Sequence, residues 1–377
     1  MRVQGERPPP AVPLRETGVA QVMTSTKVDK HPTAFTATGL PILQIALNIK
    51  QMTARLAPLL PPLAGSTPPA VAYARLLAYK QGNRGTIRYQ MTGVDLPAAT
   101  DDDGRPGSVP VLGKLYPQAS QAQRVDALLR GLWEVFSGAD GLRVPRPLGC
   151  VPELSMLAYV PVDGQPLDEV LAAGDGAAAT TAVEWTAAWL AKLHGAQLLL
   201  DRRFQVDTEL FNLQAWAALV AQAWPDQAGA ATRLAAGLRG SAARLDLRVS
   251  SPIHKDFHYK HVLVDQGVGV IDFDEVRLGD PAYDVAHFCA HLRLLAVRQL
   301  GDPDGLRALE SAFLAAYIGG GGALSVPPFS WFAAYTCLKI AKQLCTTRGV
   351  RPRPDGEDQH TQVRVMLGQG LAYLDAG

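Results

Sequence analysis

The sequence predicts an α+β fold of two lobes, a small β-rich N-lobe followed by a larger and mostly helical C-lobe. Three observations support this prediction. Strand-like segments separated by glycine- and proline-containing turns fill residues 74–160. After Gly164 the pattern changes to helices rich in alanine and leucine. A hairpin of two short apolar strands at 254–274 interrupts these helices. We therefore place the N-lobe at residues 36–160 and the C-lobe at residues 161–377.

Composition narrows the class of protein. The chain has 377 residues, 47% of them apolar, which is enough for one large or two medium domains. A net charge of +1 provides no overall field for nucleic acid or an anionic membrane, so we expect neither as a partner. Four cysteines without metal-type spacing favour free thiols and a cytoplasmic protein. The first residues contain no apolar segment typical of a secretory signal.

The N-lobe is predicted element by element. Residues 1–35 are rich in proline and polar residues, and we expect a disordered tail there. A helix should follow Pro41, with an apolar stripe made of Ile42, Ile45, Ile49, Met52 and Leu56. Strands are expected at residues 74–80, 86–91, 109–116, 144–148 and 154–160. The turn 81–85 joins the first two strands, and a helix from near Ser120 to Ser137 precedes the fourth.

In the C-lobe, residues 311–338 carry no charge, which raises the question of a membrane span. The glycines at 319–322 and the pair Pro327-Pro328 interrupt this stretch. A continuous helix of about 20 residues, the length that a bilayer requires, therefore does not fit. We expect two buried helices joined by a loop.

Two carboxylates flank the predicted hairpin. Asp256 precedes the apolar strand 262–264, a turn at Gln266-Gly267 follows, and the return strand 268–271 ends at Asp272. An antiparallel hairpin brings its outer ends together, so both carboxylates should face one cleft. Phosphoryl transfer uses such a pair, because one acid accepts the proton of the attacking hydroxyl while the other holds magnesium on the ATP phosphates.

The motifs around this hairpin resemble those of the aminoglycoside phosphotransferase and choline kinase-like family. The chain reads HKDFHYKHVLV at 254–264, VIDFDE at 270–275, GDPAYDVAHF at 279–288 and LAKLHGA at 190–196. The family reads HGDLHPGNVLV, IDF or IDW, GDPxxDLA and LAxLH. The resemblance spans about residues 70–345, and its specific part is 254–288. It implies a bilobal protein-kinase-like fold and an ATP-dependent phosphotransferase that modifies a hydroxyl of a small molecule.

The resemblance also implies roles for the acidic residues of the hairpin. Asp256 is expected to act as the catalytic base, and Asp272 as the ligand of Mg²⁺. Asp274 either assists in metal binding or caps the following turn. His254 and Asp284 are expected to be structural, with Asp284 accepting hydrogen bonds from the backbone of the catalytic loop.

Nucleotide contacts are expected from the N-lobe. Lys114, on the third strand, should contact the α- and β-phosphates of ATP. Glu134 is the first choice for the acid that orients this lysine, and Asp126 is the alternative. The backbone near Tyr159 and Val160 should form the hinge that contacts adenine.

One residue departs from the family pattern. The family has Asn five residues after the catalytic Asp, and this chain has His261. Imidazole is a poorer ligand for Mg²⁺ than an oxygen, and it suits transition metals better. His261 thus binds a softer ion such as Mn²⁺, orients phosphate without a metal, or weakens activity. We favour retained activity with one main Mg²⁺ on Asp272.

Two other functions remain open. A metallohydrolase could use a cluster formed by His254, Asp256, His258, His261 and Asp272. A pseudokinase could bind nucleotide without catalysis. For a kinase, the acceptor could be a sugar, an amino alcohol, an aminoglycoside or an amino acid. The sequence selects none of these acceptors, and it does not predict an oligomeric state.

Overall fold

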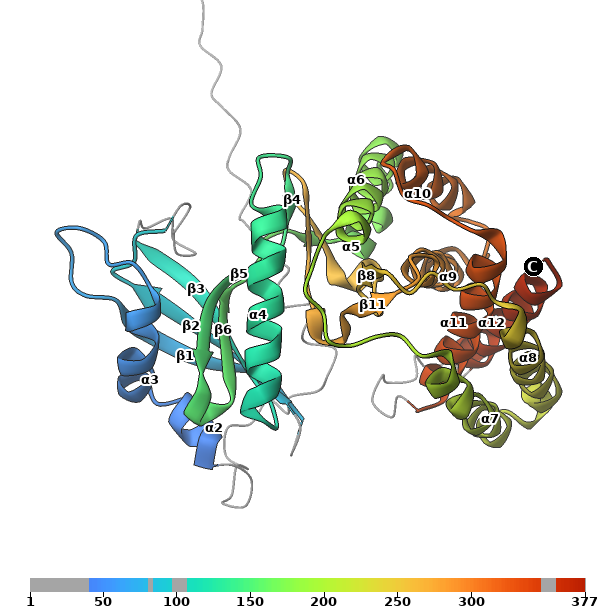
Figure 1. Cartoon of the computed structure of the whole chain (residues 1–377), viewed down its shortest axis with the longest axis horizontal. Coiled ribbons are helices and arrows are strands. Elements are labelled where there is room, and N and C mark those ends of the chain that lie inside the picture. Colours follow the sequence, from blue (N-terminus) through green and yellow to red (C-terminus); the bar gives the residue numbers. More distant parts are fainter. Residues whose placement is uncertain (1–40, 81–83, 97–106, 347–356, 377) are drawn as a thin grey trace, which may run out of the picture.

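The computed structural model describes residues 41–80, 84–96, 107–346 and 357–376. The expected tail at 1–35 and residues 81–83 of the expected turn lie outside this range. In the described part, a β-sheet with three helices forms the N-terminal side and a helical body forms the C-terminal side, so the predicted α+β, two-lobed class is confirmed (Figure 1).

The N-lobe is built on a five-stranded antiparallel sheet with the order β1-β2-β3-β6-β5. Its strands are β1 (Ala70–Lys80), β2 (Arg84–Thr92), β3 (Ser108–Leu115), β5 (Arg146–Val151) and β6 (Met156–Val160). Alternation along β6 shows its two faces, since Leu157 packs in the core shared with the C-lobe while Met156 packs in the N-lobe core. Helix α4 (Ala119–Phe136) covers the first face.

The helix expected after Pro41 is two helices, so the prediction of one continuous stripe is wrong. They are α2 (Pro41–Ala46) and α3 (Ile49–Leu56), and both pack in the N-lobe core. Asn48 separates them, because its side chain accepts a hydrogen bond from the backbone of Gln51 at 3.0 Å and so begins a new helix. Ile49, expected in the stripe, is 44% exposed.

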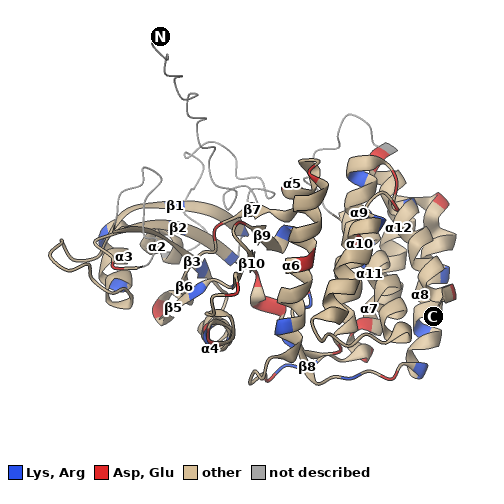
Figure 2. Ribbon diagram, turned by 90° about the horizontal axis from the view of Figure 1, so that it is seen from above, with Lys and Arg blue, Asp and Glu red and all other residues tan. Residues whose placement is uncertain are grey.

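Short strands lie between the five-stranded sheet and the helices (Figure 2). One sheet has the order β4-β10-β9-β7, and the pair β11-β8 forms another. The strands are β4 (Leu142–Arg143), β7 (Gln165–Pro166), β8 (Ser251–Ile253), β9 (Val262–Val264), β10 (Val268–Val270) and β11 (Arg277–Gly279). Strands β9 and β10 form the predicted hairpin. β4 precedes the C-lobe in sequence, yet it pairs in parallel with β10.

The C-lobe is a bundle of helices around α9 and α11. Its helices are α5 (Leu167–Ala172), α6 (Gly176–Gly195), α7 (Val206–Ala223), α8 (Ala228–Ser241), α9 (Ala282–Leu300), α10 (Arg307–Gly319), α11 (Val326–Thr346) and α12 (Glu357–Ala376). The uncharged stretch 311–338 falls on α10 and α11 with a loop between them, as predicted. Within the described ranges, none of the helices combines the length and the apolar character that a membrane span needs.

An aromatic stack joins the two lobes at the catalytic loop. Trp189 of α6 is fully buried and stacks on Phe136 of α4, with ring centroids 4.8 Å apart. Its other neighbour is Phe257, which follows Asp256 in the chain, at 5.8 Å. The indole N–H of Trp189 donates to the carbonyl of Arg143 in β4 at 3.0 Å. One tryptophan therefore connects the N-lobe helix, the short sheet and the catalytic loop.

The turn of the hairpin gives a testable prediction about stability. A Cβ atom at Gly267 would lie 2.1 Å from the carbonyl oxygen of Gly141, a backbone atom that cannot move aside easily. We expect Gly267→Ala to lower the free energy of unfolding by about 1–3 kcal/mol, the usual size of an overpacking effect. Gly240→Ala in α8 is the matched control, because nothing lies within 4 Å of its added Cβ. Urea unfolding of both variants tests this, and equal stabilities would contradict it.

Candidate active site

The catalytic loop is held by a buried carboxylate in the first turn of α9. Asp284 accepts hydrogen bonds from the backbone N–H of His254 at 2.6 Å and of Lys255 at 2.8 Å. Its predicted contact with the loop backbone is therefore confirmed. His194, from the LAKLHGA segment, also binds Asp284 at 3.1 Å. Burial alone would raise the pKa of Asp284, but the hydrogen bonds from His194 and the loop lower it below its ordinary value.

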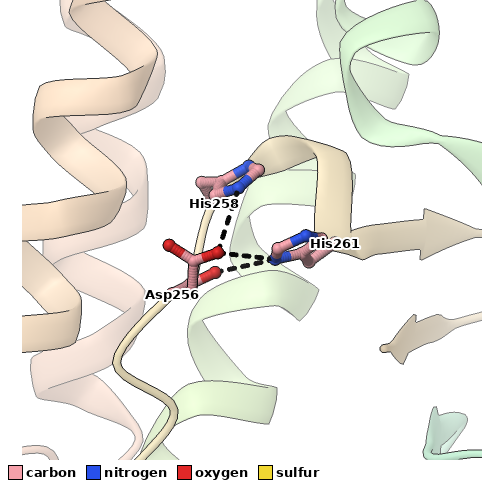
Figure 3. A group of neighbouring side chains, drawn as sticks. All are labelled: Asp256, His258 and His261. Atoms are coloured by element: carbon pink, nitrogen blue, oxygen red, sulfur yellow. Dashed lines mark hydrogen bonds and ion pairs between the residues drawn. The ribbon is translucent and has the colours of Figure 1, made fainter. Parts of the chain in front are cut away.

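Asp256 lies on this loop with its side chain 35% exposed, and its two oxygens face different neighbours. Oδ1 lies 3.5 Å from Nε2 of His287 and 3.5 Å from Nζ of Lys339. Oδ2 lies 3.9 Å from Nε2 of His258 and 3.9 Å from Nδ1 of His261 (Figure 3). Burial opposes ionisation of Asp256, yet His287 and Lys339 hold its pKa well below the ordinary value. Asp256 is therefore an anion at neutral pH.

The hairpin brings Asp272 to the same place, and one imidazole lies between the two acids. His261 places Nε2 3.8 Å from Oδ2 of Asp272, while its Nδ1 lies 2.8 Å from the backbone oxygen of Asp256. Asp272 adopts a left-handed backbone conformation, with φ of 69°, directly after β10. The expected meeting of Asp256 and Asp272 is thus confirmed as geometry, with His261 linking them.

Hydrogen bonding determines which nitrogen of His261 can bind a cation. Its Nδ1 faces a carbonyl oxygen, which only accepts, so Nδ1 carries the proton. In the neutral imidazole, Nε2 then keeps a lone pair directed at Asp272. Asp272 and Nε2 of His261 are together a suitable oxygen and nitrogen pair for a divalent cation.

A second grouping, Asp256 with His258 and His261, offers one ligand atom from each residue within 4.8 Å of one another (Figure 3). Nδ1 of His258 accepts a hydrogen bond from the backbone N–H of Lys260 at 3.2 Å, so its proton lies on Nε2. The nitrogens that face Asp256 from both histidines thus carry protons. This pattern favours an ionised carboxylate that faces imidazole N–H groups over a metal centre at Asp256.

A cavity of about 620 Å³ opens beside Asp272, a size suited to a nucleotide. Its lining includes Lys114, Tyr159, Leu263 and Asp272. Val160 is not among the lining residues, although the hinge residues that follow it are. At the predicted hinge, the cavity is thus lined by Tyr159, Pro161 and Val162.

Lys114 lies at the base of this cavity, 2.9 Å from Oδ1 of Asp272 and 2.8 Å from Oδ2 of Asp274. Burial would lower the pKa of Lys114, but the charges of Asp272 and its neighbours raise it well above the ordinary value. For Asp272, burial would raise the pKa, but the charge of Lys114 outweighs burial and lowers it. The lysine and the acid are thus both charged.

Asp274 was expected to assist in metal binding or to cap the following turn. It is buried, and its oxygens contact Lys114, Arg84 at 2.6 Å and the hydroxyl of Tyr116 at 2.7 Å. In this structure Asp274 therefore lines the cavity and holds Lys114 in place.

Neither Glu134 nor Asp126, the two acids predicted to orient Lys114, forms an ion pair with it in the described part of the structure. Glu134 lines a second cavity of about 510 Å³, and Asp126 pairs with Arg130 at 3.0 Å. Asp274 has the orienting position instead. Its place two residues after Asp272 was the signal that could have identified it.

Two further residues at the site were not selected from the sequence. His287 lies in the quoted segment 279–288, three residues after Asp284 and so one helical turn along α9. Lys339 lies on α11, more than eighty residues beyond Asp256, and no local motif marks it. Only the packing of α11 against α9 brings it to Asp256.

The histidines around Asp256 predict a dependence of stability on pH. Rings of His258 and His287 each lie 4.6 Å from that of His291, and burial lowers the pKa of all three, to about 4 for His287. Below the ordinary value of 6.5 the unfolded chain therefore binds protons that the folded chain does not. Stability should fall as pH decreases from 6.5 towards 4, by up to about 1.4 kcal/mol per pH unit for each histidine.

Urea unfolding between pH 7.5 and about 4.5 measures this slope. His287→Gln should make the slope shallower by about one proton, since glutamine does not titrate. An unchanged slope in His287→Gln, or stability that stays flat over this range, would contradict the interpretation.

Comparison with solved structures supports the fold. Amicoumacin kinase hAmiN, solved with AMP-PNP, Ca²⁺ and Ami, is 13% identical with a TM-score of 0.53, and the match covers 88% of this chain and 96% of that one. A choline/ethanolamine kinase family protein from Mesorhizobium loti is 13% identical with a TM-score of 0.50, covering 77% of this chain and 89% of that one. At this identity the likeness shows the fold alone. Among curated proteins, no match is found.

Family membership comes from the sequence match. The family model described as the phosphotransferase enzyme family, APH, matches residues 99–323. This range covers more than half of the chain and includes Lys114, the catalytic loop and the hairpin. The chain therefore belongs to the phosphotransferase enzyme family.

Proposed function

We propose that this protein transfers the γ-phosphate of ATP to a hydroxyl of a small molecule, with Asp256 as the base. The observation that carries this proposal is the pair of ionised carboxylates, Asp256 and Asp272, on either side of His261. The structural relatives named as kinases, one of them solved with AMP-PNP, are consistent with a nucleotide in the same fold.

Nucleotide binding is proposed for the cavity beside Asp272. Lys114 would contact the phosphates as a point charge, and the backbone after Tyr159 would contact the base. Asp272 and Nε2 of His261 would hold a divalent cation, Mg²⁺ or Mn²⁺. Such a cation neutralises phosphate charge when it is bound. The donor set fits this role because both ligand atoms keep a lone pair facing the same space.

Asp256 is suited to accept the proton of the acceptor hydroxyl. Its pKa is held well below the ordinary value, so it is ionised, and its side chain is partly exposed. A carboxylate with these properties orients a hydroxyl and takes up its proton as the phosphoryl group arrives.

The two rival functions have less support. A metallohydrolase would need lone pairs directed at a metal near Asp256, and the hydrogen bonds of His258 and His261 direct protons there instead. A pseudokinase need not keep Lys114, Asp256 and Asp272 together in one arrangement, and this chain does.

Removal of the base gives the first test. Asp256→Ala should lower turnover by about 10²–10⁴-fold, the usual contribution of a general base, while nucleotide binding persists. Asp265→Ala is the matched control, because this acid lies in the turn of the same hairpin. Among the described residues, its carboxylate forms an ion pair with Arg143 alone, at 3.4 Å. Steady-state ATP consumption and calorimetric binding of AMP-PNP measure the two effects. Equal activities of the Asp256→Ala and Asp265→Ala enzymes would reject the role of Asp256.

The histidine in place of asparagine gives the second test. An imidazole ligand should favour Mn²⁺ over Mg²⁺, since nitrogen suits the softer ion. His261→Asn should therefore raise the ratio of Mg²⁺-supported to Mn²⁺-supported activity, by about tenfold for a change of 1.4 kcal/mol in relative metal affinity. Titrations of each metal in the ATP assay measure this ratio. A ratio that stays the same would show that His261 does not contact the metal.

A further inference from the structure

The two oxygens of Asp256 divide its surroundings into a nucleotide side and an opposite side. Oδ2 faces His261, whose other nitrogen faces Asp272 and the nucleotide cavity. Oδ1 faces His287 of α9 and Lys339 of α11, which both belong to the helical C-lobe. An acceptor hydroxyl that donates to Oδ1 therefore lies next to the ammonium of Lys339.

The Oδ1 side carries positive charge. Lys339 is 18% exposed, and among the described residues Asp256 is its ion-pair partner. Lys342 lies one helical turn further along α11, with its ammonium 5.1 Å from the ring of Trp216. Burial and the charge of Lys339 lower the pKa of Lys342, which shows that the two ammonium groups repel each other.

Besides Asp256, one acid among the described residues acts on Lys339, and it is already paired with another lysine. Glu209 of α7 is buried, binds Nζ of Lys255 at 2.7 Å and accepts a hydrogen bond from the hydroxyl of Tyr335. Burial opposes ionisation of Glu209, yet Lys255, Tyr335 and Lys339 hold its pKa below the ordinary value. This one carboxylate is thus shared between ammonium groups and does not fully balance Lys339 and Lys342. His287, the other neighbour of Asp256 Oδ1, is buried and its pKa is lowered to about 4. Its ring is therefore neutral at neutral pH and does not change the charge on this side.

We propose that the acceptor is a small hydroxy compound that carries a carboxylate or phosphate group, held by Lys339 and Lys342 while its hydroxyl faces Asp256. This inference rests on the proposed kinase function and narrows its substrate class. A cationic acceptor would place its charge beside two lysines with no free acid among the described residues to receive it. An anionic acceptor would relieve the repulsion between them.

Three probes of similar size test the charge preference: D-glycerate as the anion, glycerol as the neutral compound and ethanolamine as the cation. Binding to the complex of the enzyme with AMP-PNP is measured by calorimetry at one low ionic strength, and turnover is followed by ATP consumption. We expect D-glycerate to bind at least about tenfold more tightly than glycerol, with ethanolamine the weakest. Equal binding, tighter binding of either other probe, or no binding of D-glycerate would overturn the proposal.

Variants assign the preference to the lysines. Lys339→Met should remove the advantage of D-glycerate over glycerol and leave the affinity for AMP-PNP within about twofold, since Lys339 lies on the opposite side from the nucleotide. Lys339→Met removes the ion-pair partner of Asp256 and could therefore also impair the base. Lys342→Met leaves that ion pair intact, and it should still reduce the advantage of D-glycerate over glycerol. Lys192→Met is the control, because it removes the same charge from α6, where Lys192 pairs with Asp140. If D-glycerate keeps its advantage in both α11 variants, the lysines do not hold the acceptor.

The two proposals fail in different ways. If the unmodified protein does not bind AMP-PNP in the presence of a divalent metal, the kinase function is rejected. Intact AMP-PNP binding without a preference for the anion would reject only the acceptor class.

Discussion

The geometry of the site depends on one buried carboxylate, that of Asp284. It receives two backbone N–H groups from the catalytic loop and the ring N–H of His194, and none of its surface is exposed. Lys255, one of the two donors, has a φ of 68°, which a residue with a side chain adopts only at a cost. The hydrogen bonds to Asp284 offset this cost and fix the direction in which the next residue, Asp256, leaves the backbone.

From this fixed loop, charged groups follow one another across the cleft, with the two acids placed between two lysines. Lys114 contacts Asp272, His261 lies between Asp272 and Asp256, and Asp256 contacts Lys339. Burial on its own would neutralise the two acids, and the neighbouring cations keep them ionised. These charged side chains are therefore arranged before any ligand arrives, which would reduce the reorganisation that the proposed phosphoryl transfer requires.

The parts of the site that could be predicted are those that local sequence encodes. The hairpin follows from two apolar strands and a glycine-containing turn, and the meeting of Asp256 and Asp272 follows from hairpin geometry. Asp284 was found through the resemblance of its motif. In contrast, the break at Asn48 depends on a side chain that competes for backbone N–H groups, a balance that the apolar pattern does not show.

Long-range packing explains the remaining failures. The acid that holds Lys114 could not be chosen by counting along α4, because the direction of that helix relative to β3 is set by its core face. Asp274 reaches the lysine from a different lobe, 160 residues away in the sequence. Lys339 is further still from any motif, and its position beside Asp256 exists only when α9 and α11 pack together.

The parallel pairing of β4 with β10 has a consequence for motion between the lobes. The chain leaving α4 is attached to the hairpin that carries Asp272 through this pairing, and to α6 through the hydrogen bond from Trp189 to the carbonyl of Arg143. The end of α4 near Phe136 must therefore travel with the C-lobe. In a hinge opening about this attachment, the far edge of the five-stranded sheet would move most. Lys114 would then move away from Asp272 while the aromatic stack keeps its contacts.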